Sequence, residues 1–216
     1  MTPDLTTSAA VAIVIAIAVA ILDWWSVATG RRWLEAWAKP AVLVALIAAS
    51  VLLQPANNTI GWLVTAGLAC GLLGDVALFL DHFELGTGVF LLGHVCYIIA
   101  FALAWHSLAF SAVALVAGLL LLAFVGRPIA KAAAREDERL ERLVMAYELV
   151  LILMAVAAFG TQKAWAIAGA NLFIVSDTYL GWTRFIGRET VPSRVVVHVT
   201  YHLAQIAFVI ALLRLA

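Results

Sequence analysis

The sequence predicts an all-α membrane protein, a bundle of eight transmembrane helices that forms one domain over residues 1–216. Three observations predict this class. The 216 residues are 65% hydrophobic and only 12% charged, with a mean hydropathy of +1.07, whereas a soluble domain needs far more polar surface. The apolar residues gather in eight runs long enough to cross a bilayer. No linker-like stretch divides the chain.

Turn-forming or charged residues separate the eight apolar runs. Proline lacks a backbone donor and asparagine bonds to its own backbone, so both mark turns. The breaks fall at 30–32, 54–58, 81–84, 126–128 and 187–194. The predicted spans are 8–28, 39–53, 60–80, 86–105, 109–125, 144–160, 165–183 and 195–213. The N-terminus has no basic residue before its first apolar run, which favours a first membrane helix over a cleaved signal peptide.

The basic residues predict the orientation of the spans. Eleven of the 13 lysines and arginines follow odd-numbered spans, within residues 31–39, 127–142 and 184–194. The positive-inside rule therefore places these loops in the cytoplasm and both termini outside the cell membrane. The loop 127–143 mixes both charges at helical spacing, which predicts a cytoplasmic helical extension or, alternatively, a surface for lipid headgroups or a partner. The basic residues form no nucleic-acid-binding stripe, and nothing in the sequence indicates an oligomeric state.

Two carboxylates lie inside predicted spans. Asp75 lies about 7 Å and Asp177 about 9 Å before the cytoplasmic ends of the third and seventh spans. A charge at that depth is costly unless it is paired, protonated or facing a polar cavity, so both are candidate functional residues. Asp23, at the inner end of the first span, is expected at the membrane interface. Polar side chains at a similar depth lie on three other spans: His94, Tyr97, Tyr147, Glu148, His198, Tyr201, His202 and Gln205. Together they predict a water-filled cavity open to the cytoplasmic leaflet, although a lone histidine or tyrosine also commonly bonds two membrane helices together.

A short internal match relates the two halves of the chain. The segment HVCYIIAF at 94–101 matches HVTYHLAQ at 198–205, and the two aspartates are separated by nearly the same offset. The match predicts two parallel four-helix repeats around an axis along the membrane normal. Such repeats would place the two acids on opposite sides of a central cavity.

Several segments together resemble one family. They are Lys39-Pro40, GLLGDVALFL at 71–80, FLLGHVCYIIAF at 90–101, Tyr147 with Met154, GANLFIVSDTYL at 169–180 and TYHLAQ at 200–205. In these segments the chain resembles the YhhN-like lysoplasmalogenases. The resemblance implies a membrane hydrolase that cleaves the vinyl-ether bond of a lysophospholipid, giving a fatty aldehyde and a glycerophospho-alcohol. It also implies that Asp75 and Asp177 are the catalytic acids. His198 and His202 are not part of the family pattern.

Vinyl-ether hydrolysis requires a proton delivered to carbon and water added to the resulting oxocarbenium ion. A pair of carboxyl groups divides these tasks in glycoside hydrolysis. We therefore expect one of Asp75 and Asp177 to be the general acid and the other to activate water, with no cofactor. The side chains expected to orient water and the glycerol backbone, or to hold the phosphate, are Lys39, His94, Tyr97, Tyr147, Tyr201 and Gln205.

Two other classes of function fit the same residues. A zinc-dependent intramembrane lipid hydrolase of the ceramidase type would use His198 and His202, one helical turn apart, with the two aspartates as ligands. A proton-coupled transporter of small molecules would use the acids to bind a proton at the interface between repeats.

Overall fold

The protein is a bundle of long helices in the computed structural model, which describes residues 6–53 and 58–215. The helices are α1 Thr7–Ala28, α2 Arg32–Leu53, α3 Thr59–Phe79, α4 Phe83–Leu103, α5 Leu108–Leu121, the π-helical turn η1 Leu122–Gly126, α6 Arg127–Ala133, α7 Glu138–Gly160, α8 Ala164–Phe185 and α9 Val191–Leu215. Within these residues there is no strand. The predicted all-α class is confirmed.

The described residues contain seven helical stretches that are long and apolar enough to cross a membrane. These are α1, α2, α3, α4, α7, α9 and the continuous stretch Leu108–Ala133, which joins α5, η1 and α6. The remaining long helix, α8, has 22 residues but carries Asn171, Ser176 and Asp177 in its middle. Those polar side chains make α8 less apolar than the seven stretches above. Its crossing of the membrane, the eighth, therefore stays a prediction.

Most helices begin before the predicted membrane spans. The structure begins α2 at Arg32 rather than 39, α4 at Phe83 rather than 86, α7 at Glu138 rather than 144, and α9 at Val191 rather than 195. The predicted starts followed the apolar runs, but helices continue past the hydrocarbon layer into polar surroundings. In α2 the error has a consequence, because Lys39 lies two turns inside the helix and not at its start. Pro40 is also internal, so it cannot donate to the carbonyl of Ala36.

The predicted break at 126–128 is wrong. Pro128 closely follows the π-helical turn η1, and the helix continues through it to Ala133. The helical extension expected over 127–143 is present as α6 and the first turns of α7. Of the break at 54–58, only Asn58 lies among the described residues, and it caps α3 by accepting from the backbone amides of Ile60 and Gly61.

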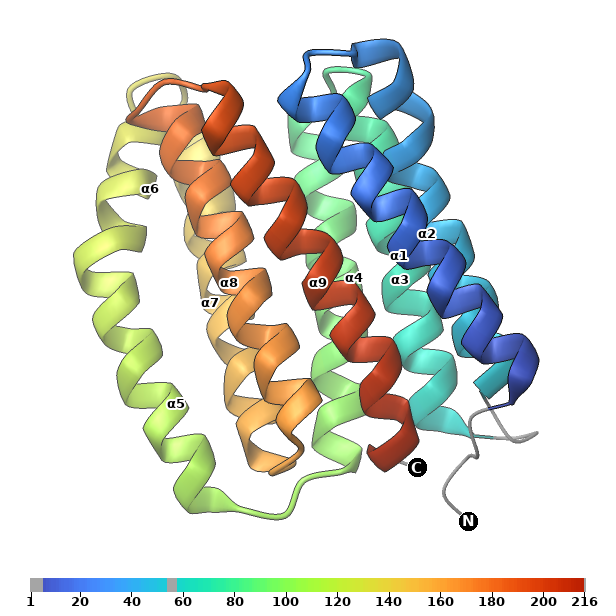
Figure 1. Cartoon of the computed structure of the whole chain (residues 1–216). Helices are drawn as coiled ribbons and strands as arrows, with labels where there is room; N and C mark the ends of the chain where they lie inside the picture. The colour runs from blue at the N-terminus through green and yellow to red at the C-terminus, as the bar shows by residue number, and fades with distance from the viewer. Residues whose placement is uncertain (1–5, 54–57, 216) are drawn as a thin grey trace.

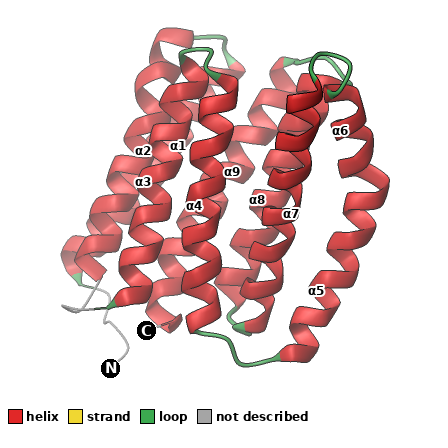
Figure 2. Ribbon diagram, turned by 180° about the vertical axis from the view of Figure 1, so that it is seen from behind, coloured by secondary structure: helices red, strands yellow, loops and turns green. Residues whose placement is uncertain are grey.

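Helices that follow one another in sequence pack side by side in pairs. α1 packs against α2, α3 against α4, and α8 against α9, while α4 also packs against α7 and α9 against α1 and α2. α5 lies at the edge of the bundle, where it packs on α7 (Figures 1 and 2). Figure 1 places both termini at one end, with the α1–α2, α3–α4, α6–α7 and α8–α9 connections at the other. The two-repeat architecture stays a prediction.

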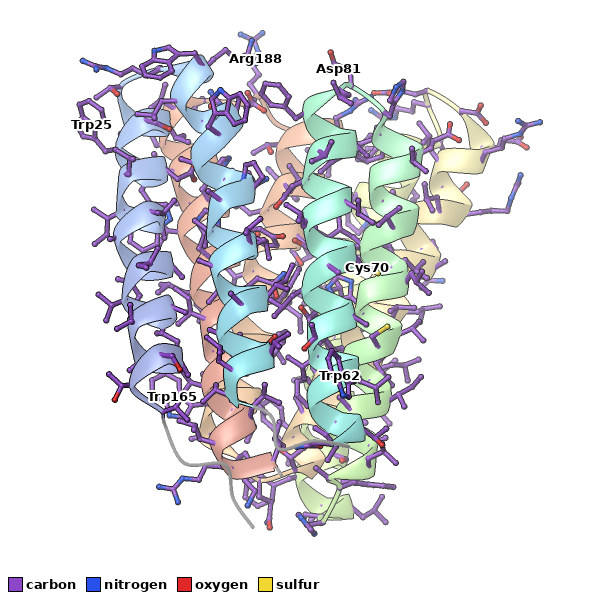
Figure 3. All side chains as sticks on the ribbon, turned by 90° about the vertical axis from the view of Figure 1, so that its right-hand side faces the viewer. Trp25, Trp62, Cys70, Asp81, Trp165 and Arg188 are labelled. Atoms are coloured by element: carbon purple, nitrogen blue, oxygen red, sulfur yellow. The ribbon has the colours of Figure 1, made fainter. Side chains whose placement is uncertain are left out.

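The outer surface of the bundle suits a bilayer. Large apolar side chains are exposed along the helices, for example Leu92, Val116 and Phe124. Figure 3 places Trp25 near the end that carries Asp81 and Arg188, and Trp62 and Trp165 towards the opposite end. Tryptophans commonly gather at the two membrane–water interfaces. The chain is therefore a membrane-embedded helical protein.

An aromatic cluster fills the middle of the bundle where α4, α8 and α9 meet. The rings of Tyr97 and Phe208 lie 4.6 Å apart between centroids, and those of Phe173 and Phe208 6.1 Å apart. Two glycines make room for it, because a Cβ at Gly67 would lie 2.4 Å from the Tyr97 ring and one at Gly169 2.6 Å from Phe208. The cluster separates the polar site from the terminus end of the bundle.

Candidate active site

Two adjoining cavities occupy the bundle near the end that carries the α1–α2, α3–α4, α6–α7 and α8–α9 connections. The outer cavity, of about 890 Å³, lies between α2, α3, α8 and α9 and is lined by charged residues of the connecting segments, including Arg32, Asp81 and Glu189. The inner cavity, of about 70 Å³, continues between α4, α6, α7 and α8. Six residues line both: Lys39, Asp75, Leu78, Phe83, Leu180 and Val197.

Asp75 forms a buried ion pair with Lys39. The lysine Nζ lies 2.7 Å from Asp75 Oδ1, and only 2% of the aspartate side chain is exposed. The position of Lys39 two turns into α2 brings its side chain across to α3. The same ammonium lies 5.3 Å from the centre of the Tyr201 ring. Burying two charges together is costly, and removing one partner alone costs about 3–5 kcal/mol.

Asp177 has a different set of partners. The Tyr147 hydroxyl donates to its Oδ2 at 2.5 Å. His94 lies on the other side, with Nε2 at 3.9 Å from the same oxygen and Nδ1 held 2.7 Å from the Phe90 carbonyl. Neither lysine nor arginine comes within ion-pair distance of Asp177 among the described residues. Both aspartates nevertheless line the inner cavity.

Tyr97, Gln205 and Tyr201 form the polar floor below Asp75. The Tyr97 hydroxyl donates to Gln205 Oε1 at 2.6 Å, which fixes the orientation of the amide. Gln205 Nε2 and the Tyr201 hydroxyl are both buried without a hydrogen-bond partner in the described structure. A Cβ at Gly71 would lie 3.0 Å from each of these two atoms. Buried polar atoms are normally satisfied, so the pair is ready to bind a water molecule or a polar group of a ligand.

His198 and His202 face α1 instead of the two catalytic candidates. His198 Nδ1 lies 2.7 Å from Asp23 Oδ2, and His202 Nδ1 lies 3.8 Å from the same atom. Trp24 donates its indole N–H to His202 Nδ1 at 3.2 Å. The predicted four-ligand zinc set is therefore not assembled, and within the described residues no group of three or more His, Cys, Asp or Glu side chains could hold a metal ion. Asp23, expected near the membrane interface, is fully buried between helices beside His198, and its depth in the membrane stays a prediction.

Other charged residues in the cavity walls were not among the predicted site residues. Glu35 pairs with Arg194 across α2 and α9, and Arg194 Nε also lies 3.6 Å from Glu189. Glu148, 5% exposed, lines the inner cavity next to Asp177. Glu35 precedes Lys39 by one helical turn, a spacing that would have placed both on one face had α2 been predicted from Arg32.

The fold and the site define a polytopic helical membrane protein with a buried acidic cavity that opens at one end of the bundle. The model of the YhhN family matches residues 34–212, which is most of the chain and includes every predicted site residue. The chain therefore belongs to the YhhN family. Neither the curated proteins nor the solved structures contain a match to it.

Proposed function

We propose that this protein is a membrane hydrolase that cleaves the vinyl-ether bond of lysoplasmalogens. The observation that carries the proposal is the placement of Asp75 and Asp177 in the wall of one cavity, inside a membrane-embedded bundle. Hydrolysis of this bond needs one group that gives a proton to carbon and another that receives a proton from water, and two carboxyls supply both. Membership of the YhhN family supports the same reaction.

The partners of the two aspartates suggest a division of roles. Asp75 faces the Lys39 ammonium, which stabilises a carboxylate, so Asp75 is the base that activates water. Asp177 accepts from a neutral phenol and faces no lysine or arginine within the described chain, so it is the acid. Tyr147 and His94 hold its carboxyl group in position, while Gln205 and Tyr201 bind the water or the glycerol oxygens.

The reaction then consumes one water molecule. Asp177 gives its proton to the outer vinyl carbon, and the carbon attached to oxygen becomes an oxocarbenium ion. Water adds to that carbon as Asp75 takes its proton. The hemiacetal next loses its hydroxyl proton and expels the glycerol oxygen, which is protonated on leaving, so that an aldehyde and an alcohol are released. A proton passed from Asp75 to Asp177 restores both groups.

The proposed membrane arrangement places the substrate within reach. All eight long helices, α8 included, cross the cell membrane, with both termini outside and the outer cavity open to the cytoplasmic side. The support for this is the concentration of lysine and arginine at the cavity end of the bundle. A lysophospholipid of the cytoplasmic leaflet would reach the cavity with its headgroup at the charged rim.

The test is product analysis with purified protein in detergent or nanodiscs. The substrates are 1-alkenyl lysophosphoethanolamine, 1-alkenyl lysophosphocholine and their 1-acyl counterparts. We expect a fatty aldehyde and a glycerophospho-alcohol from the alkenyl lipids only. Release of fatty acid from the acyl lipids, or no product from any of the four, would contradict the proposal.

A further inference from the structure

The inner cavity has an apolar half that acid–base chemistry does not use. Around Asp177 its walls are made by Thr87 of α4, Ile129 of α6, Val144 and Glu148 of α7 and Gly181 of α8, and most of the cavity surface is apolar. Ile129 and Val144 are buried and belong to an apolar cluster separate from the main core. The outer cavity, by contrast, is lined by charged groups from all four of its helices. One ligand that bridges both cavities must therefore be polar at one end and apolar at the other.

The two catalytic candidates lie close to the place where these cavities meet. Asp75 lines both cavities, and Asp177 lines the inner one. In a lysoplasmalogen the scissile bond joins the polar glycerophosphate part to the single hydrocarbon chain. If the bond lies between the aspartates with the headgroup in the outer cavity, the chain points into the inner one.

An aromatic pair restricts this junction. Phe83, which lines both cavities, packs edge-on against Phe185 with 5.7 Å between ring centroids. The Arg184 guanidinium lies 4.8 Å from the centre of the Phe185 ring and 5.5 Å from that of Phe83. Both terminal nitrogens of Arg184 donate to Glu136 in the α6–α7 connection at 2.8 Å. The pair thus contacts an exposed ion pair between the last turn of α8 and the α6–α7 connection.

A helix that lines the inner cavity is preceded by the irregular turn of the fold. The π-helical turn η1 lies between α5 and α6, immediately before the helix that contains Ile129. A Cβ at Gly126 would lie 3.4 Å from Glu148, so the turn packs directly on a cavity-lining side chain. π-helical turns are rare and occur frequently at functional sites.

We propose that the inner cavity is the binding site for the single hydrocarbon chain of a lysolipid, and that Phe83 and Phe185 move apart to admit it. The proposal rests on the proposed function and names where the substrate's chain lies. At about 70 Å³ the cavity holds roughly two water molecules at ~30 Å³ each, so a chain enters only when the aromatic pair and the η1–α6 wall are displaced. The space between Thr87, Ile129 and Val144 then limits the length of the hydrocarbon chain that binds.

A chain-length series tests the assignment by kinetics. Thr87→Trp fills the inner cavity from a half-buried position, and Leu85→Trp adds the same side chain at an exposed position of the same helix as a matched control. With alkenyl lysophosphoethanolamines of increasing chain length, we expect Thr87→Trp to lower kcat/KM for the longest chain roughly tenfold more than for the shortest, the effect of about two buried methylene groups. Leu85→Trp should preserve the wild-type length dependence. Equal length dependence in the two variants would overturn the assignment.

Photo-crosslinking tests the same site without requiring turnover. The probe is a non-cleavable 1-alkyl lysophosphocholine with a diazirine near the end of its chain, added to the full-length wild-type protein. We expect labelled peptides from the cavity-lining parts of α4, α6, α7 and α8, and loss of this labelling in Thr87→Trp but not in Leu85→Trp. Labelling confined to the outer faces of α1 or α5 would overturn the chain site. Cavity labelling by a protein that hydrolyses no alkenyl lipid would leave the chain site standing and contradict the proposed function alone.

Discussion

Asp75 and Asp177 lie on helices of the same direction and line the same inner cavity, yet their surroundings differ. Asp75 has an ammonium from the preceding helix at 2.7 Å, whereas Asp177 has a phenol from the preceding helix at 2.5 Å. The aspartate on α3 is thus held by an ion pair with a lysine, and the one on α8 by a hydrogen bond from a tyrosine. In the proposed mechanism this difference lets one architecture supply a base and an acid by changing a single neighbour of each carboxyl group.

Removing either carboxyl should have the largest effect on catalysis. Asp75→Asn and Asp177→Asn each lose a proton-transfer group, and positioned acids and bases contribute about 10²–10⁴-fold to rate. We expect kcat to fall by that order in each variant, measured as aldehyde release per folded molecule after size-exclusion chromatography. Near-wild-type turnover in both folded variants would contradict the proposed roles.

Breaking the ion pair should have the largest effect on stability. Lys39→Met leaves the Asp75 carboxylate buried without its cation, at a cost of about 3–5 kcal/mol in the free energy of unfolding. The double variant Lys39→Met/Asp75→Asn should recover much of that loss, because no unpaired charge remains. Urea or thermal unfolding in detergent measures both variants. An equal loss in the single and double variants would show that Lys39 stabilises the fold by packing alone.

Removing the Tyr147 hydroxyl should distinguish the roles of the two carboxyl groups. Tyr147→Phe deletes the donor to Asp177, and we expect kcat to fall about tenfold, the usual order for a hydrogen bond to an ionisable group. In the Asp177→Asn background the same substitution should have no further effect on kcat. Tyr97→Phe, which removes a hydroxyl bonded to Gln205 and to neither aspartate, is the matched comparison and should cost less.

The histidines on α9 should affect folding more than chemistry. His198→Ala leaves the fully buried Asp23 without its 2.7 Å partner, so we expect a loss of about 1–3 kcal/mol in unfolding free energy. The folded fraction should retain most of its kcat, and dialysis against a chelator should leave wild-type activity unchanged. Stoichiometric zinc that is lost together with activity would favour the zinc-dependent alternative.

The smallest effect is expected at the exposed ion pair between Arg184 and Glu136, beside the aromatic pair Phe83 and Phe185. Hydrogen bonds from Arg184 keep the pKa of Glu136 below its ordinary value. The carboxylate therefore stabilises the fold at neutral pH, and that contribution is lost as the pH falls through the depressed pKa. Glu136→Gln should lower Tm slightly at pH 7 and not at all at strongly acidic pH. An equal difference at both pH values would show that charge is not responsible.

The sequence predicted the helical class and most of the polar layer because both follow from local patterns. A carboxylate in an apolar run is conspicuous by itself, and so is the concentration of basic residues in alternate loops. Of these residues, Asp75, Asp177, Tyr147, Glu148 and Tyr201 line one inner cavity. Tyr97 and Gln205 bond to each other outside its lining, and His198 and His202 turn towards α1.

Other features depended on contacts between distant helices. Asp23 was expected at the interface because it adjoins tryptophans, but its burial results from His198, 175 residues further on. Glu35 was absent from the predicted site because the second span was predicted to begin at Lys39, whereas α2 begins at Arg32 and carries Glu35 to Arg194. The pairing of Lys39 with Asp75, and of Tyr147 with Asp177, likewise depends on which faces α2, α3, α7 and α8 turn to one another.

The most direct test of the central claim is mass analysis of the products formed from 1-alkenyl lysophosphoethanolamine in deuterium oxide. Proton transfer to carbon followed by addition of water predicts a fatty aldehyde with one deuterium on the carbon next to the carbonyl group, together with glycerophosphoethanolamine. The label should enter at a rate that falls in Asp177→Asn. Unchanged substrate with the wild-type protein, or an aldehyde without deuterium at that carbon, would contradict the account.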